Sequence, residues 1–331
     1  DRKILNGNKV EKSNKSLHYY LAKFLGSDDA GLEVVTTSLL PRGSGMGTSS
    51  ILGGCALAAI QHCIGLKSDK TYNNKDNYDH YDNQMDDDRL LINSVLRLEQ
   101  LMGTGGGWQD QIGGLPSGGG AKFGFSDRGI SFPVIANFER ISIPIAAIQE
   151  LNDRLILVFT GKSRLARNVL RHVINRWEQR GKEIVSTVEE LHKCARKCAL
   201  ALKEGDIDTV GRLMSIYRKQ KATMAGKGSC AEPEYIKSAL EVLEEHNRVV
   251  EGAMMCGAGG GGFLALLAIK GKTAEEIKAL LKTSDKISLS SGNRDVKLSE
   301  ASWEKFTWHE CKVANKGLTV RFQTNHITDK D

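Results

Sequence analysis

The chain has 331 residues, which is enough for two domains with cores of their own, and its apolar content of 40% is ordinary for a globular protein. Its formal net charge of +6 is spread over both halves, which suits small anionic ligands and excludes the dense basic stripe typical of nucleic-acid-binding proteins. No apolar run is long enough to span a membrane and no signal peptide opens the sequence, so we expect neither nucleic-acid nor membrane partners.

The first elements follow from apolar patterns. Residues 1–16 are polar and basic and predict no regular structure, whereas bulky residues at helical spacing predict a helix over 17–25. The β-branched run 32–40 predicts a strand, and the small apolar residues 51–64 predict a buried helix.

A glycine-rich turn joins this strand to this helix. It reads PRGSGMGTSS over residues 41–50 and carries several hydroxyl groups. Glycine lets a backbone approach a phosphate closely, and the free N–H groups and dipole of a helix N-terminus attract anions. The alternative is an ordinary corner capped by Thr48 or Ser49, and the pattern by itself leaves both interpretations open.

Residues 68–89 have a different composition. They are rich in Asp, Asn, Lys and Tyr without apolar periodicity, which predicts a mobile loop. His80 among these aspartates is a candidate metal ligand, but a solvated loop is the more usual meaning of such a stretch.

A second glycine-rich segment follows a helix predicted over 90–101. Residues 103–111 deliver Asp110 on a glycine-rich turn, between Gln109 and Gln111. Glu99 lies eleven residues earlier, on the helix. Asp110 could be a functional acid or an ordinary turn residue, and Glu99 could be functional or an ordinary residue on a helix surface.

Short apolar runs near residues 123, 130 and 141 predict strands, and 155–159 predicts a buried strand. We place a domain boundary near residue 150, which gives domains 1–150 and 151–331. The second domain is predicted to be an α+β layer. Its predicted helices cover 165–177, 184–202, 207–217, 235–250 and 273–281. Its further strands are predicted at 253–256, 263–269 and 287–289, with a hairpin of 308–313 and 318–322.

The seven cysteines include no C-x-x-C pair, and most have apolar neighbours. This pattern predicts reduced thiols in a cytoplasmic protein. Cys194 and Cys198 lie one helical turn apart on the apolar stripe of 184–202, so we expect them to pack in the core rather than bind a metal.

A third glycine loop, 257–262, precedes an apolar strand. The chain has neither a Walker A motif nor the H-R-D and D-F-G segments of protein kinases. Phosphoryl transfer needs a phosphate cradle, a divalent cation with a carboxylate to hold it, and an acid to orient the nucleophile. Ser49, Glu99 and Asp110 are candidates for these parts.

Residues 41–50 resemble the P-x-x-x-G-x-G-S-S-A signature of the GHMP kinases, and 257–262 resembles the third glycine motif of that family. TGGGWQDQIGG over 104–114 and LVFTGKSRLARN over 157–168 are similar to the fucokinase branch. The resemblance covers most of the chain. It implies an α+β fold of two domains, the first like domain 2 of ribosomal protein S5 and the second ferredoxin-like.

The resemblance also implies roles for individual residues. The residues expected to bind the ATP phosphates are Gly43, Gly45, Met46, Gly47, Thr48 and Ser49. Ser49 and Glu99 would hold Mg²⁺, and Asp110 would be the catalytic residue that orients or deprotonates the sugar hydroxyl. Gly259 and Gly260 would shape the site near the sugar. Arg164 would neutralise phosphate charge, although a helix-surface role is equally consistent with its position.

The implied activity is ATP- and Mg²⁺-dependent phosphorylation of L-fucose to fucose 1-phosphate, in the salvage route to GDP-fucose. The alternatives are a heptose-phosphate 1-kinase of the same fold and a nucleotide- or sugar-binding sensor without turnover. The sequence departs from the family at Thr48 and Ser50, where the signature has serine and alanine. It also lacks the early G-G-W-S-D-T-like segment of fucokinases, so we expect an upstream domain in a longer protein or a reduced sugar pocket.

Overall fold

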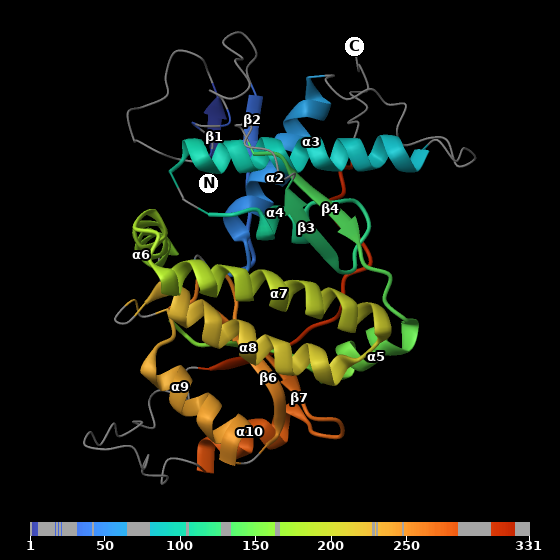
Figure 1. The fold of residues 1–331 in the computed structure, drawn as a ribbon. Helices are drawn as coiled ribbons and strands as arrows, with labels where there is room; N and C mark the ends of the chain where they lie inside the picture. Colours follow the sequence, from blue (N-terminus) through green and yellow to red (C-terminus); the bar gives the residue numbers. More distant parts are fainter. Residues whose placement is uncertain are drawn as a thin grey trace.

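The computed structural model of the chain has the α+β architecture that the sequence predicts (Figure 1). It describes residues 2–5, 17, 19, 21, 32–41, 43–64, 80–103, 106–126, 134–162, 166–226, 229, 231–246, 248–283 and 306–321. The elements up to β4 are β1 (Arg2–Leu5), β2 (Leu32–Val35), α2 (Thr48–Cys63), α3 (His80–Leu101), α4 (Gln109–Gly114), β3 (Lys122–Ser126) and β4 (Ala136–Arg140). Those that follow are α5 (Ile145–Arg154), β5 (Leu155–Phe159), α6 (Ala166–Glu178), α7 (Lys182–Glu204), α8 (Ile207–Ala225), α9 (Glu234–Leu240), the π-helical η2 (Glu241–His246), β6 (Val250–Met255), β7 (Phe263–Ala268), α10 (Ala274–Thr283) and β8 (Thr307–Glu310). None of the described helices is both long and apolar enough to cross a membrane.

Helix α2 lies at the centre of the N-terminal half because its small residues let other elements approach closely. Leu57 of α2 is fully buried in one cluster with Leu98 of α3 and Ile112 of α4. A Cβ added at Gly54 would lie 2.3 Å from a methyl carbon of Leu115, so glycine is needed there for this packing. The close packing brings the start of α2, the end of α3 and the start of α4 to one place.

The C-terminal half is built on a four-stranded antiparallel sheet in the order β6-β7-β5-β8. Every residue of β7 is buried, as expected for an inner strand covered on both faces. Helices α7 and α8 run side by side across the middle of the molecule, and α8 packs against β6 (Figure 1). A Cβ at Gly252 of β6 would lie 1.7 Å from the carbonyl oxygen of Gly211 of α8. This backbone-to-backbone contact needs glycine and holds α8 against β6.

The end of the described chain returns to the N-terminal half. Leu318 and Val320 pack against the cluster around α2, and the Gly120 N–H donates to the Ala314 carbonyl at 2.7 Å. The predicted boundary near residue 150, between domains 1–150 and 151–331, stays a prediction. If the chain is divided there, Leu318 and Val320 belong to the second domain by sequence but pack on the first.

Two expectations for the N-terminal half are wrong. Residues 2–5 form β1, which pairs antiparallel with β2, because partners about thirty residues away in sequence satisfy its backbone. Helix α3 begins at His80 rather than at residue 90, so the predicted loop is helical over 80–89. The buried carboxylate of Asp88 explains part of this: it accepts hydrogen bonds from the backbone and hydroxyl of Ser117, both near 3 Å, and pairs with Arg140.

The predictions for the C-terminal half hold better. The helices and strands expected at 155–159, 165–177, 184–202, 263–269 and 273–281 are present within a few residues, and the helix expected over 207–217 starts as predicted but continues to Ala225. The predicted hairpin is wrong, because β8 pairs with β5 and the segment 318–321 packs on the N-terminal half instead. The helix expected over 235–250 ends earlier, since Val250 already belongs to β6. The strands expected near 130 and at 287–289 lie outside the described residues.

A buried ion-pair network fixes α8. Arg218, with a side chain 6% exposed, pairs with Glu232 and, at 2.8 Å, with Glu244. Replacing Arg218 by Met should lower the free energy of unfolding by about 3–5 kcal/mol, because two largely buried carboxylates would lose their cation. Urea denaturation measures this, with the exposed neighbour Lys219→Met as the control. A loss below about 1 kcal/mol would contradict the role of this network.

Candidate functional site

The three glycine-rich segments meet at one place, although more than two hundred residues separate the first from the last. A Cβ on Gly45 would lie 2.5 Å from the Cys256 carbonyl oxygen, and the Phe263 N–H donates to the Ser44 carbonyl at 2.8 Å. A Cβ on Gly47 would lie 2.7 Å from the Cβ and Cγ atoms of Asp110. These contacts join the first loop to both of the others.

A cavity of about 690 Å³ opens where the loops meet. Its wall includes Asp110 and Trp108 from the second glycine segment, Met46 from the first and Gly257 from the third. Helices α7 and α8 and strand β3 close the other sides. The lining residues from these elements are Lys122, Phe123, Gly124, Ala195, Cys198, Ala199, Leu202 and Tyr217. Cys198, expected in the core, is therefore only partly buried and borders the cavity, whereas Cys194 is buried as predicted.

Asp110 is the carboxylate that faces this cavity, on the first turn of α4. Burial raises the pKa of its carboxyl group above the ordinary value, the charge of Glu99 raises it further, and the charge of Lys221 lowers it. A carboxylate with a raised pKa is a stronger base, which is useful for accepting a proton from a hydroxyl group.

Glu99 lies behind Asp110 and is 7% exposed. Ser50 Oγ donates to its Oε1 and Gln111 Nε2 donates to its Oε2, both at 2.8 Å. The structure thus brings Glu99 together with Ser50, whereas Ser49 is exposed. That Ser49 ligates the metal stays a prediction. The hydroxyl group that contacts the Glu99 carboxylate directly is that of Ser50.

The residues around Glu99 fit a divalent cation that is shared with a phosphate ligand. Carboxylate, hydroxyl and amide oxygens are the donors that Mg²⁺ prefers, and the fully buried Gln111 Oε1 has no hydrogen-bond partner. Among the described residues no three His, Cys, Asp or Glu side chains cluster. Mg²⁺ sites completed by substrate phosphates need only one or two carboxylates.

Replacing Glu99 by Gln should weaken Mg²⁺ binding in the presence of nucleotide at least about tenfold, because the cation loses its buried carboxylate. Mn²⁺ titration followed by electron paramagnetic resonance measures the affinity. The matched control is Glu139→Gln, a change in an exposed carboxylate of β4. Equal affinities in Glu99→Gln and the control would remove Glu99 from the metal site.

The N-terminus of α2 is open to an anion. Gly47 caps it in the left-handed conformation without a side-chain hydrogen bond, and its first turn contains no acidic residue. Ser44 Oγ and Thr48 Oγ1 lie 3.3 Å apart at this end. The first backbone N–H groups of a helix have no partner inside the helix, so here they are available to phosphate oxygens.

The third glycine loop contributes to the cavity through Cys256 and Gly257 rather than through Gly259 and Gly260. The Gly260 N–H donates to the Ala231 carbonyl at 2.7 Å, and a Cβ at Gly259 would lie 2.3 Å from the same oxygen. These two glycines thus hold the loop against residue 231. Arg164, expected near the phosphates, lies outside the described residues.

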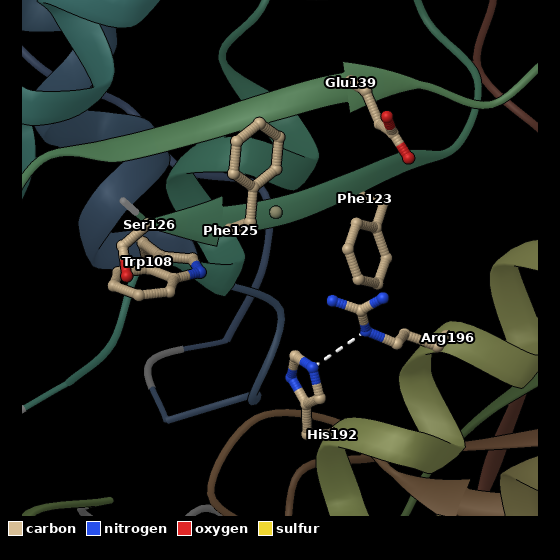
Figure 2. Close-up of a pocket in the computed structure, with 8 residues that line it drawn as sticks. Trp108, Phe123, Phe125, Ser126, Glu139, His192 and Arg196 are labelled. Carbon is tan, nitrogen blue, oxygen red and sulfur yellow. Dashed lines mark hydrogen bonds between the residues drawn. The ribbon is translucent and has the colours of Figure 1, made fainter. Parts of the chain in front are cut away.

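A second pocket, of about 720 Å³, adjoins the cavity and shares Trp108, Phe123 and Gly124 with it (Figure 2). His192 and Arg196 of α7 point toward Phe123, and Arg196 Nε donates to His192 Nε2 at 2.8 Å (Figure 2). Aromatic rings on one side and planar polar groups on the other suit a polar organic ligand, such as a sugar.

Sequence reasoning missed several residues of this site. Ser50 appeared only as a departure from a family signature, and Gln111 only as a neighbour of Asp110. Tyr217 and Lys221 of α8 were not singled out at all, because a tyrosine and a lysine inside a helix of mixed composition carry no local signal. Only the contact between α8 and β6 places them here.

Known proteins resemble this chain in sequence and in fold. Residues 198–284 match the family model described as GHMP kinases C terminal. The chain is 35% identical over 260 residues to the bifunctional fucokinase/GDP-fucose pyrophosphorylase of Arabidopsis thaliana, covering 77% of this chain and 22% of that protein. It is 28% identical over 253 residues to the L-fucokinase/L-fucose-1-P guanylyltransferase of Bacteroides fragilis, covering 76% of this chain and 24% of that protein. The matches thus span less than a quarter of each relative's length.

A solved structure with a similar fold is that of Lactococcus lactis galactokinase complexed with galactose, with a TM-score of 0.54. The identity is 14%, and the alignment covers 93% of this chain and 77% of that chain. At this identity the likeness is one of fold.

Proposed function

We propose that this chain is an ATP-dependent sugar kinase of the GHMP kinase family, which phosphorylates the anomeric hydroxyl of L-fucose. The match over residues 198–284 and the 35% identity to a fucokinase relative support this proposal. The observation that carries the proposal is the placement of Asp110 in a cavity where all three glycine loops converge. The names of the two relatives support fucose as the acceptor.

The first glycine loop and the start of α2 bind the triphosphate in this proposal. Their N–H groups and positive φ values at Gly43, Gly45 and Gly47 allow close contact with phosphate oxygens. Met46, Thr48 and Ser49 complete this segment. Glu99 and Ser49 would hold the cation, with Ser50 and Gln111 orienting the Glu99 carboxylate. Bound Mg²⁺ would neutralise charge on the transferring phosphoryl group.

Asp110 orients the sugar hydroxyl and accepts its proton. The hydroxyl oxygen forms a bond to the γ-phosphorus while the bond from that phosphorus to the β,γ-bridging oxygen breaks, which releases ADP and fucose 1-phosphate. Trp108 and Phe123 provide apolar faces next to Asp110, against which the C–H groups of a sugar ring can pack. Gly259 and Gly260 support this wall indirectly by holding the third loop.

A panel of acceptors tests the proposal. The 331-residue chain is incubated with Mg·ATP and L-fucose, D-galactose, D-mannose or a heptose phosphate, and ADP release is followed with a coupled assay. We expect turnover with L-fucose and a phosphorus NMR signal of an anomeric phosphate. Turnover with the heptose phosphate but not with fucose would overturn the assignment of L-fucose as the acceptor. Calorimetric binding of ATP and fucose without ADP release would overturn the activity in favour of a sensor.

A further inference from the structure

A buried lysine lies behind the wall of the catalytic cavity. Lys221, on the last turns of α8, is 7% exposed and is not among the residues that line the cavity. Its Nζ donates to the Met255 carbonyl at 2.8 Å and to the Gly257 carbonyl at 2.6 Å. These two carbonyls flank the junction between β6 and the third glycine loop, so the ammonium group fastens this junction to α8.

The position of Gly257 makes this clamp relevant to the first loop as well. A Cβ on Gly257 would lie 2.8 Å from the Gly45 Cα, so the two loops touch through their backbones. Any movement of residue 257 is therefore passed on to Gly45, which lines the same cavity. By this contact Lys221 holds both the third loop and the phosphate-binding loop.

A clamp alone does not explain a buried charge. The other buried cation of α8, Arg218, is paired with two carboxylates, whereas within the part of the chain described no ion pair joins Lys221 to a carboxylate. Burying an ammonium group without a close counter-ion is unfavourable, and a neutral donor could serve the two carbonyls. The positive charge of Lys221 acts instead on Asp110, because it lowers the pKa of the Asp110 carboxyl group.

We propose that Lys221 is a positioning residue of the phosphoryl-transfer site, which fixes the third glycine loop and supplies the positive charge that faces Asp110. The inference rests on the proposed kinase activity, since it assigns Asp110 a reacting hydroxyl group. The charge favours the ionised carboxylate of Asp110 and offsets part of the negative charge that Glu99 and a triphosphate bring to the cavity.

The proposed role of the Lys221 charge predicts a pH dependence of the activity, because Lys221 loses its charge at alkaline pH. Burial lowers the pKa of Lys221 to about 8, against the opposing effects of Cys256, Glu232 and Asp110, which face it from the end of β6, the segment before α9 and α4. The ring centroid of Tyr217 is 5.5 Å from Lys221 Nζ, and the pKa of this tyrosine is raised by burial. The charged form of Lys221 is present below pH 8 and is lost above it.

Hydrogen exchange tests the clamp without any turnover. The amides of Gly260, Gly262 and Phe263 are hydrogen-bonded in the loop, so exchange over residues 256–263 reports its order. Lys221→Met should raise their exchange at least about tenfold, and the exposed control Lys219→Met should leave it unchanged. Equal exchange in both variants would overturn the clamp, whether or not the chain phosphorylates fucose.

Kinetics test the charge. With L-fucose, kcat of the unmodified chain should fall as the pH rises through about 8. The kcat of Lys221→Arg should stay within about tenfold of that of the unmodified chain. It should not decrease at alkaline pH, because a guanidinium group stays charged. Lys221→Gln, which keeps a hydrogen-bond donor but no charge, should lose roughly 10²-fold in kcat at pH 7. The role of the charge would be overturned if Lys221→Gln kept the kcat of the unmodified chain. It would also be overturned if kcat of Lys221→Arg still decreased as the pH rises through about 8. Absence of fucose turnover in the unmodified chain would instead refute the proposed function and leave the exchange test decisive.

Discussion

Replacing Asp110 by Asn should lower kcat for fucose phosphorylation by about 10²–10⁴-fold, the usual contribution of a positioned general base. Asparagine has nearly the same shape and still forms hydrogen bonds, but it cannot accept the proton of the sugar hydroxyl. Binding of Mg·ADP, measured by calorimetry, should persist because the phosphate-binding residues are unchanged. A variant that keeps kcat within threefold of the unmodified chain would exclude Asp110 as the base.

The matched control is Asp153→Asn, which changes an exposed aspartate at the end of α5. The pH dependence offers a second check on the same residue. The base form of Asp110 exists only above its pKa, which burial and Glu99 raise, so kcat of the unmodified chain should fall as the pH is lowered through this raised pKa. The remaining activity of Asp110→Asn should lack this acidic fall.

Replacing Gly47 by Ala should lower kcat by about 10²-fold or more although the fold persists. The new Cβ would lie 2.7 Å from Cβ and Cγ of Asp110, so the carboxylate has to move. A displacement of about 1 Å at a reacting group is enough for a loss of this size. Steady-state kinetics with fucose and ATP measure the change.

Gly103→Ala is the control that isolates this clash. Gly47 and Gly103 have similar φ values, 64° and 68°, so alanine costs about 1–2 kcal/mol of backbone strain at either position. Only Gly47 has Asp110 beside it, since a Cβ at Gly103 meets no atom within 4 Å. Both variants should therefore lose thermal stability through this strain, and only Gly47→Ala should also lose kcat through the displaced carboxylate. An equal loss of kcat in both would show that strain, and not displacement of Asp110, is responsible.

The helices and strands of the C-terminal half could be predicted because their signals are local. The apolar stripe of 184–202 has helical spacing, and the residues of β7 form a short unbroken apolar run. The start of α3 at His80 could not be predicted, since residues 80–89 lack such a stripe and Asp88 is held by Ser117 and Arg140. The strand β1 likewise depends on pairing with a distant segment.

The candidate site shows the same division. Glycine-rich composition, hydroxyl groups and a single acid marked the segments around Gly47 and Asp110, because these properties belong to the residues themselves. The sequence thereby determined which loops could bind phosphate and which carboxylate could act as base. The tertiary structure decided that Ser50 contacts Glu99 and that Lys221 holds the Gly257 carbonyl of the third glycine loop. Those relations depend on how α2, α3 and α8 pack, and packing is a property of surfaces that meet only after the chain has folded.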